Sequence, residues 1–319
     1  MINPSIFRLP PSSVCVCKVV GSDSVKILNN LTTQAIAELS DGEACESFVT
    51  NVRGKTLGHG FVFRESAECL WFLGSANPDP NADTGARQST RLDQQVEKYT
   101  IREDAAVEIC DGKYSVYVVP PEAKEVFPDA FGNAWVGAPV HAAAWSGLTS
   151  WCGPDTGVLV VATEEASHFE SVLSDGIEWN IAGEDGFQKR RIAEGFPWYH
   201  LDLDEKNLPQ EMGRDDEAIS FTKGCYLGQE IVAIMDARRQ VQRLWLGGRV
   251  TEGKVGRGDL LIADEDSEGK ASPVVRVTSA SDDFFRGFVR RSHFDAGSRA
   301  KLVSEAGEIL ARVEITADE

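Results

Sequence analysis

The spacing of apolar residues changes along the chain, and it predicts a mixture of strands and helices in the first 240 residues. Residues 14–20, VCVCKVV, are an apolar run of strand length, whereas residues 24–39 repeat their apolar side chains at helical spacing. Further strand-like runs are ESFVTN, GFVFR and CLWFLG, and a polar helix with Leu92, Val96 and Tyr99 on one face follows them. These elements predict a first mixed lobe.

A second mixed unit begins near Ala106, with strand-like runs VEIC, YSVYVVP and GVLVVA. Helical spacing occurs around residues 169–173 and again at residues 185–193, where Gly195 and Pro197 end the helix. Strands and helices do not alternate strictly in either unit. The pattern therefore predicts an α+β fold of two lobes, and not a doubly wound parallel sheet.

The pattern changes again after Arg239. From there short β-rich runs are separated by Gly, Asp and Ser turns, which is typical of an all-β sandwich or a small barrel. We therefore expect two domains: residues 1–240 contain the two lobes, and residues 241–319 form a C-terminal β-barrel.

Composition and charge exclude several classes of protein. The chain has 319 residues, of which 42% are apolar, and a formal net charge of −18. A broad nucleic-acid-binding face is not expected, because phosphate contacts need basic residues. No apolar run approaches the roughly 20 residues of a membrane helix, and the first residues lack a signal-peptide pattern. We expect a cytoplasmic protein without direct contact to nucleic acid or membrane.

Seven cysteines are scattered along the sequence, and no two of them form a CxxC pair. The spacing therefore predicts neither a zinc site nor a thioredoxin-type couple, and no iron–sulfur cluster held by this chain alone. Free thiols in a reducing compartment fit this distribution. No bound metal is expected.

The segment SFTKGCYLGQEIVA, residues 220–233, contains residues for which packing alone gives little reason. Gly224 and Gly228 permit backbone conformations or close approaches that a Cβ would block. Lys223 lies two residues from Cys225, so in an extended backbone both side chains point to one side and the ammonium group favours the thiolate. A cysteine that serves only as a small buried hydrophobe is the alternative interpretation.

Two polar residues follow in the same segment. The amide of Gln229 and the carboxylate of Glu230 precede an apolar stretch, IVAIM, that is expected to begin a helix. Together they present the donor and acceptor edges that recognition of a fused heterocycle requires. The segment is therefore a candidate for ligand binding as well as for thiol chemistry.

The segment AISFTKGCYLGQEIVA resembles the K-G-C-[YF]-x-G-Q-E signature of the YgfZ-type folate-binding proteins, relatives of the aminomethyltransferase (T-protein) of the glycine cleavage system. Upstream, RIAEGFPWYHLDLDEKNLPQE is similar to a conserved segment of that family, and downstream RRQVQRLWLGG resembles the start of its C-terminal barrel. In the first half, LNNLTTQAIAEL and TNVRGKTLGHGFVFR resemble its L-x-x-x-L-T-x-D and N-x-x-G-R patterns. The resemblance is strongest over residues 187–245.

The resemblance implies a cloverleaf of two α+β lobes around a central pocket, plus the barrel, with tetrahydrofolate or a one-carbon derivative as ligand. It places Phe187 and Arg191 among the folate contacts, with Arg191 able to pair with a carboxylate. Asn51, which aligns with the first residue of the T-protein pattern N-x-x-G-G-x-x-D-D, is expected there too. The expected contacts from the signature itself are Gly224, Tyr226, Gly228, Gln229 and Glu230.

Some positions depart from the family pattern. Gly58 and His59 stand where the T-protein pattern has its two acids. Acid–base catalysis in that pocket needs groups that exchange protons and carry the right charge, so glycine-cleavage aminomethyl transfer is not expected. Val14 stands where the family can present a tryptophan to the ligand, and Ile234 replaces an arginine.

By resemblance, the expected role is folate-dependent support of iron–sulfur cluster assembly or repair, and through it of tRNA modification. Cys225 is the expected reactive residue, Lys223 lowers its pKa, and the expected partners are folate and iron–sulfur proteins or assembly factors. Two alternatives stay open: a folate-dependent one-carbon (aminomethyl or methyl) transferase acting on an unknown amine, and a protein-interaction module that kept the fold without the ligand. Whether the chain is an enzyme stays open as well, and a monomer is expected.

Overall fold

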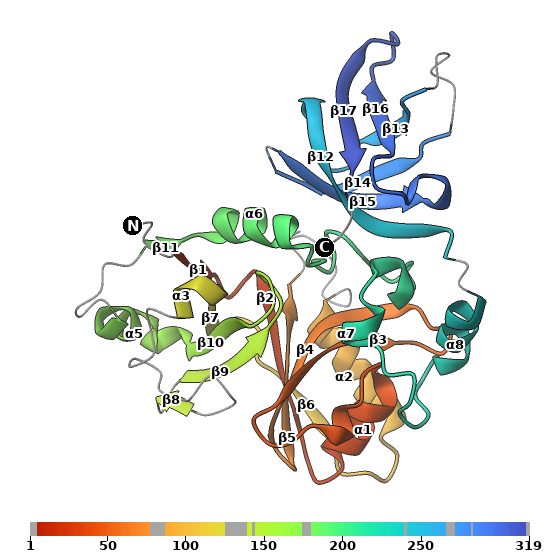
Figure 1. Ribbon diagram of the computed structural model, residues 1–319. Helices are drawn as coiled ribbons and strands as arrows, with labels where there is room; N and C mark the ends of the chain where they lie inside the picture. Colours follow the sequence, from red (N-terminus) through yellow and green to blue (C-terminus); the bar gives the residue numbers. More distant parts are fainter. Residues whose placement is uncertain are drawn as a thin grey trace.

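The fold of the chain, seen in a computed structural model, consists of two open β-sheets and one closed barrel, with short helices against the sheets (Figure 1). The structure describes residues 5–76, 87–124, 139–141, 144–173, 180–238, 241–265, 272–281 and 283–316. Strands and helices are mixed in both lobes, and the barrel follows them in sequence. This arrangement confirms the α+β class and the C-terminal barrel that the sequence predicted.

The first lobe is an antiparallel sheet of order β3-β4-β5-β2-β6. Its strands are β2 (Val14–Val20), β3 (Ala44–Thr50), β4 (Thr56–Ser66), β5 (Cys69–Ser75) and β6 (Ala106–Ile109), and its helices are α1 (Ser24–Leu31), η1 (Ile36–Glu38) and α2 (Gln88–Tyr99). In β2, Cys15, Cys17 and Val19 pack with α1 and α2, while Val14 and Val16 pack toward the second lobe. Burial on both faces explains why six of the seven residues of this strand are apolar, Lys18 being the exception.

The second lobe is a sheet of order β11-β1-β7-β10-β9-β8. Its strands are β1 (Ser5–Leu9), β7 (Tyr114–Val119), β8 (Pro139–His141), β9 (Ala144–Thr149), β10 (Thr156–Ala162) and β11 (Asn180–Ala182), and its helices are α3 (Pro121–Lys124), η3 (Thr163–Glu165), α5 (Ala166–Leu173) and α6 (Glu184–Glu194). Strand β1 precedes the first lobe in sequence yet pairs with β7 and β11, which sequence periodicity did not predict. One apolar cluster therefore contains residues of both lobes.

The C-terminal barrel closes in the order β12-β15-β14-β13-β16-β17. Its strands are β12 (Arg243–Gly253), β13 (Leu260–Ala263), β14 (Val275–Ala280), β15 (Phe284–Arg290), β16 (Arg299–Val303) and β17 (Ile309–Ile315), and η5 (Arg291–His293) follows β15. Its core is aliphatic apart from Phe285. Residues 239–240 lie outside the described residues, so the domain boundary at 240 stays a prediction.

The segment between α6 and the barrel runs back over the first lobe. It contains η4 (Pro209–Met212), α7 (Asp215–Ala218) and α8 (Gln229–Arg238). Its main chain bonds to the first lobe: the amide of Ser220 donates to the carbonyl oxygen of Thr33 at 3.0 Å, and that of Leu227 to Asn30 at 2.8 Å. Within the described ranges, no helix is both long and apolar enough to span a membrane.

Helix α6 ends against the barrel. Gly195 follows its last residue with φ of +79°, in the left-handed region that glycine adopts without strain. A Cβ at this position would lie 2.7 Å from the guanidinium group of Arg286 on β15. That group donates to the carbonyl oxygens of Ile192 at 2.9 Å and Ala193 at 3.2 Å. The barrel thus supplies a cation to the negative end of the helix dipole.

Asp202 provides a second, buried connection to the barrel. Its carboxylate accepts hydrogen bonds from Arg191 on α6 at 2.6 Å and from Thr278 and Ser279 on β14 at 2.5 and 2.6 Å. The register of β14 shifts between Val277 and Ser279. Such a bulge aims two consecutive side chains to one side of the strand. It therefore brings both hydroxyl groups to the same carboxylate.

Candidate functional site

The segment that the sequence singled out forms a loop between α7 and α8, which we call the cysteine loop (residues 220–228). Lys223 anchors it: the ammonium group donates to the carbonyl oxygens of Asn29 at 2.6 Å, Thr32 at 2.9 Å and Gln34 at 2.6 Å. These oxygens lie at and just beyond the C-terminal end of α1, where carbonyl groups lack helical partners. A buried lysine therefore caps α1 from a distant part of the chain.

The three bonds use the full donor capacity of the ammonium group. Burial lowers the pKa of Lys223 to about 8, an effect partly offset by Cys45 and Glu38. Burial raises the pKa of Cys45 to about 12, and Lys223 opposes that shift. The contacts of this lysine thus lie with α1 and β3, and its predicted effect on the pKa of Cys225 stays a prediction.

Cys225 is the exposed cysteine of the chain, whereas the other six thiols are buried or half-buried. It lies at the rim of a hollow of about 350 Å³, which we call the cysteine hollow. Ile27 and Leu31 of α1, Tyr99 of α2 and Tyr226 wall the hollow, and Asn30, Glu103 and Leu227 complete its lining. The volume is at the lower end of the range, about 300–1,000 Å³, of small-molecule sites. The thiol is therefore accessible beside a largely apolar recess.

Gly228 and Asn51, both predicted ligand contacts, lie against each other through their main chains. Gly228 has φ of +85°, and a Cβ there would lie 2.4 Å from the carbonyl oxygen of Asn51. The side-chain oxygen of Asn51 accepts from the amides of Arg53 and Lys55, which closes the turn between β3 and β4. Nothing lies within 4 Å of a Cβ built at Gly224. Gly228 is thus the glycine that the loop requires.

Gln229 and Glu230 begin α8, as the sequence predicted for a helix following the motif. The side-chain oxygen of Gln229 accepts from the amide of Tyr226 at 3.3 Å, and Glu230 is exposed. The ammonium group of Lys223 lies 5.2 Å from the ring centre of Tyr226. These contacts hold the loop, and ligand contacts by these residues stay a prediction.

Phe187 and Arg191, the other predicted folate contacts, lie on α6 and are fully buried. The ring of Phe187 packs edge-to-face with Trp151 and Trp198. Arg191 pairs with Asp202, as described above. In Figure 1, α6 lies apart from α8 and the cysteine loop, so the structure does not bring the two sets of predicted contacts together.

A larger cavity of about 740 Å³, which we call the interlobe cavity, lies where the two lobes meet. The strand β2, the start of α2, the turn after β6 and the start of α6 contribute to it. Its lining includes Val14, Arg87, Gln88, Asp111, Glu184 and Trp198. Val14 is the position that the resemblance assigned to the ligand pocket. The cavity wall contains the buried indole of Trp198 together with several polar groups, a lining that suits a polar heterocycle.

A buried polar network, the Glu46 network, occupies the position where the T-protein pattern has its acids. The carboxylate of Glu46 on β3 accepts from Arg214 at 2.5 and 2.6 Å and bonds to the ring of His59 at 2.8 Å and the hydroxyl of Ser150 at 3.2 Å. The His59 ring is stacked between the rings of Phe48 and Phe196. A carboxylate is thus present beside His59, supplied by the neighbouring strand.

The charge state of this network follows from its contacts. Burial alone would raise the pKa of Glu46, but Arg214 and the hydrogen bond with His59 lower it to about 2. Sequence reasoning missed Glu46. The available signal was a charged residue between apolar positions of a strand, ACESFVT, which usually indicates a buried partner.

Comparison with known proteins agrees with this architecture. No family model matches the sequence. The glycine cleavage system aminomethyltransferase T from Bartonella henselae has a similar structure, with a TM-score of 0.81 and 16% sequence identity over 99% of this chain and 86% of that one. The fold is therefore that of the T-proteins.

Sequence relatives narrow the class. The chain is 23% identical over 236 residues to the tRNA-modifying protein YgfZ of Escherichia coli, covering 72% of this chain and 67% of that protein. It is 34% identical over 94 residues to YgfZ of Yersinia enterocolitica, covering 28% of each. In sequence the chain is similar to YgfZ proteins, and in fold it is similar to a T-protein, as the resemblance in the sequence indicated.

Proposed function

We propose that this chain binds tetrahydrofolate, or a one-carbon derivative of it, and supports iron–sulfur cluster assembly or repair and through it tRNA modification. The observation that carries the proposal is the placement of Cys225: an exposed thiol, in a loop held by a buried lysine, at the rim of a recess. Exposure and a fixed backbone suit a thiol that forms a transient bond with a partner. The name of the sequence relatives, tRNA-modifying protein YgfZ, supports the final step.

We place the folate in the interlobe cavity. Its volume of about 740 Å³ is suited to a drug-sized heterocycle. The half-buried carboxylate of Glu184 is an acceptor for the pterin ring, while Trp198 and Gln88 are buried in the cavity wall. Arg87 is a cation for the glutamate tail of the ligand. Arg87 and Glu184 replace Phe187 and Arg191 as the proposed direct contacts, because Phe187 and Arg191 are both buried, the first in aromatic packing and the second in an ion pair.

The proposed folate site and the thiol lie at opposite ends of α2. Gln88 at its start lines the interlobe cavity, and Tyr99 at its end lines the cysteine hollow. Eleven residues of helix span about 16 Å. Folate and the sulfur atom therefore do not touch, and in this proposal the folate acts on the thiol through α2 and α1. Tyr226 walls the recess for the partner, and Gln229 holds the loop by accepting a hydrogen bond from the amide of Tyr226.

Folate binding is tested by intrinsic fluorescence. Trp198 lines the interlobe cavity, so tetrahydrofolate is expected to change the emission in a saturable way, and Trp198→Phe to remove most of that change. Trp245 on β12, which packs with Met212 and Phe288 and does not line the interlobe cavity, gives the matched control, since Trp245→Phe is expected to keep the response. An emission that tetrahydrofolate leaves unchanged, or a response lost only in Trp245→Phe, contradicts this placement.

The role of the thiol is tested by complementation. Cells that lack the protein receive the wild type, Cys225→Ser or the control Cys69→Ser, and the activity of a cluster-containing tRNA-modifying enzyme is measured. We expect Cys225→Ser to lose nearly all of the restoring activity and Cys69→Ser to keep it. Full restoration by Cys225→Ser overturns the thiol mechanism.

A turnover assay distinguishes the proposed role from the alternative, in which the protein transfers a one-carbon unit to an amine. Methylene-tetrahydrofolate is incubated with the protein and candidate amines, and free tetrahydrofolate is followed over many equivalents. We expect no multiple turnover. Steady turnover that persists in Cys225→Ser would assign the chain to the transferases instead.

A further inference from the structure

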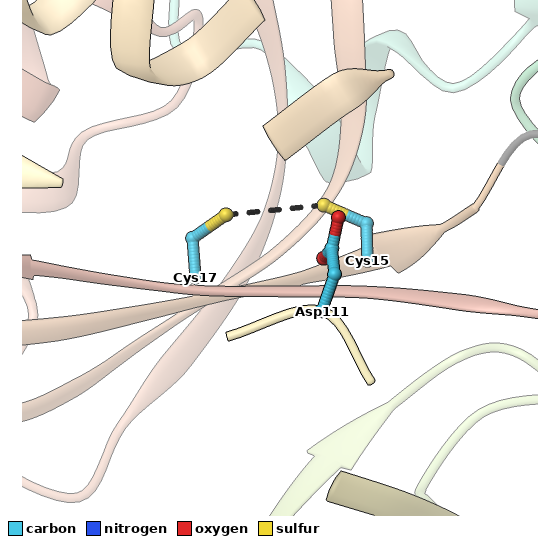
Figure 2. A group of neighbouring side chains, drawn as sticks. All are labelled: Cys15, Cys17 and Asp111. Carbon is cyan, nitrogen blue, oxygen red and sulfur yellow. Dashed lines mark hydrogen bonds between the residues drawn. The ribbon is translucent and has the colours of Figure 1, made fainter. Parts of the chain in front are cut away.

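We propose that Cys15, Cys17 and Asp111 form a binding site for a thiophilic divalent metal ion of the zinc class. The three side chains lie in the first lobe, away from the cysteine loop, and nothing in the proposed folate role requires them. Figure 2 shows both sulfur atoms on the same side of β2, with the Asp111 carboxyl group turned to that side as well. The proposal therefore adds a site to this protein.

Strand geometry explains how the two thiols come together. Residues two apart on an extended strand point to the same face, so the C-x-C spacing in β2 pairs the side chains. The sulfur atoms of Cys15 and Cys17 lie 4.0 Å apart. Two thiolates bound tetrahedrally to zinc at about 2.3 Å are about 3.8 Å apart. The two sulfurs are thus already near the separation that a shared metal ion requires.

Asp111 supplies the third ligand. It lies in the turn after β6, and its ligand atom and the two sulfur atoms lie within 4.8 Å of one another. Its carboxylate is oriented by two hydrogen bonds, from the amide of Val16 at 3.0 Å and from the hydroxyl of Ser89 at 2.6 Å. Outer contacts of this kind fix the orientation of metal-binding carboxylates in other sites. Tightening the set to coordination distance takes movements of up to about 1 Å.

The chemistry of the donor set favours a borderline-soft dication. Two thiolates and one carboxylate suit zinc, whereas magnesium and calcium prefer an all-oxygen set. A coordinated thiol loses its proton outright, so each bound ion releases two protons and leaves a site of net charge −1.

A fourth coordination position faces the interlobe cavity, because Cys15, Ser89 and Asp111 all line that cavity. Zinc sites with three protein ligands and one open position bind water or a substrate atom there. The sequence did not predict a metal site, because it contains no CxxC pair and a ligand contributed 94 residues after Cys17 has no local signal. The metal would thus lie at the wall of the cavity in which we place the folate.

A disulfide between the two cysteines is the competing outcome. Adjacent same-face positions of a strand lie about 6.6 Å apart at Cα, near the upper limit of about 6.8 Å for a disulfide. The strand would have to bend to close that bond. The metal requires no such change of the backbone, and the geometry favours it.

The test is a cobalt titration of the reduced, metal-free protein in a Cys225→Ser background, which removes the exposed thiol. Binding at the site is expected to give a thiolate-to-cobalt charge-transfer band that saturates at one equivalent, with strong visible bands of tetrahedral cobalt. Zinc is expected to abolish both. The Cys15→Ala/Cys17→Ala double variant is expected to lose the bands, and Asp111→Asn to weaken binding at least tenfold.

Matched controls are Cys110→Ala and Cys152→Ala, which remove buried thiols outside the cluster and should leave the bands unchanged. Near-ultraviolet circular dichroism checks that each variant is folded. If the double variant does not fold, Asp111→Asn, at a half-buried turn position, still decides the question. The proposal is overturned if no charge-transfer band forms. It is also overturned if the band keeps its full strength in the double variant or in Asp111→Asn, or if the two thiols are lost to a disulfide. No folate is present in the assay, so this outcome is independent of the proposed function.

Discussion

The ammonium group of Lys223 lies 2.6 Å from the carbonyl oxygen of Asn29, a residue 194 positions earlier in the chain. With its two further bonds to Thr32 and Gln34, it completes the C-terminal end of α1 and fixes the cysteine loop on the first lobe. The lysine of the motif is therefore a structural cation. The exposed position of Cys225 depends on it.

Substitution of this lysine is expected to destabilise the protein. Lys223→Met removes three charge-assisted hydrogen bonds and leaves carbonyl groups without donors, which costs about 3 kcal/mol in the free energy of unfolding. Urea unfolding measures the loss. Lys254→Met, at an exposed position, is the control and should change the midpoint little. Equal midpoints for the two variants would contradict the anchoring role.

The two glycines of the motif are expected to differ in their tolerance of a side chain. Gly228→Ala places a Cβ 2.4 Å from the carbonyl oxygen of Asn51 in a left-handed backbone conformation. Strain and the clash together are expected to cost about 2 kcal/mol or more. Gly224→Ala meets nothing within 4 Å and is expected to unfold like the wild type. Thermal unfolding of both variants checks this, and a reversed order would contradict the loop conformation.

The Glu46 network is expected to make stability depend on pH. The folded-state pKa of Glu46 is about 2, below the ordinary value of 4.5, so its contribution is present above pH 4.5 and is lost as the pH falls toward 2. Wild type should therefore exceed Glu46→Gln in stability most at about pH 6, and the difference should shrink toward about pH 3. Urea unfolding at several pH values measures it. The exposed Glu308→Gln serves as control, and a difference that stays constant with pH would contradict the ion pairs.

One thiol is expected to react ahead of the others. Burial raises the pKa values of Cys45 and Cys69 to about 12, so both stay protonated near neutral pH, while Cys225 is exposed. Brief alkylation of the native protein, followed by peptide mass spectrometry, should label Cys225, and the other six thiols should react after unfolding. Fast labelling that persists in Cys225→Ser would show that another thiol is accessible.

Sequence patterns correctly predicted those strands and helices whose burial or end signals are encoded within the element itself. Strand β2 is apolar except at Lys18 because both of its faces are buried. Helix α6 ends one residue from the expected position because Gly195 caps it. The barrel was recognisable because each short strand carries its own β-rich run and turn. Strand β1 was not predicted, because its pairing with β7 depends on contacts far apart in sequence.

The site was harder to predict for the same reason. Sequence spacing suggested that Lys223 faces Cys225, but a lysine has several rotatable bonds and its position was decided by free carbonyl groups of α1. The Glu46 network joins β3, β4, the end of β9 and the start of α7, and no local pattern links those segments. Family resemblance identified the motif, while the partners of its residues required the tertiary structure.

The bulge in β14 has a consequence for how this architecture can be recombined. Thr278 and Ser279 both donate to the buried carboxylate of Asp202. A barrel taken from another protein and fused after α8 therefore needs hydroxyl groups at both positions to dock against α6. A barrel that lacks them would leave the buried side chains of Asp202 and Arg191 short of hydrogen-bond partners. The resulting loss of stability is not offset by apolar contacts elsewhere. Whether a chimera between relatives folds stably is therefore expected to depend on the side chains at positions 278 and 279.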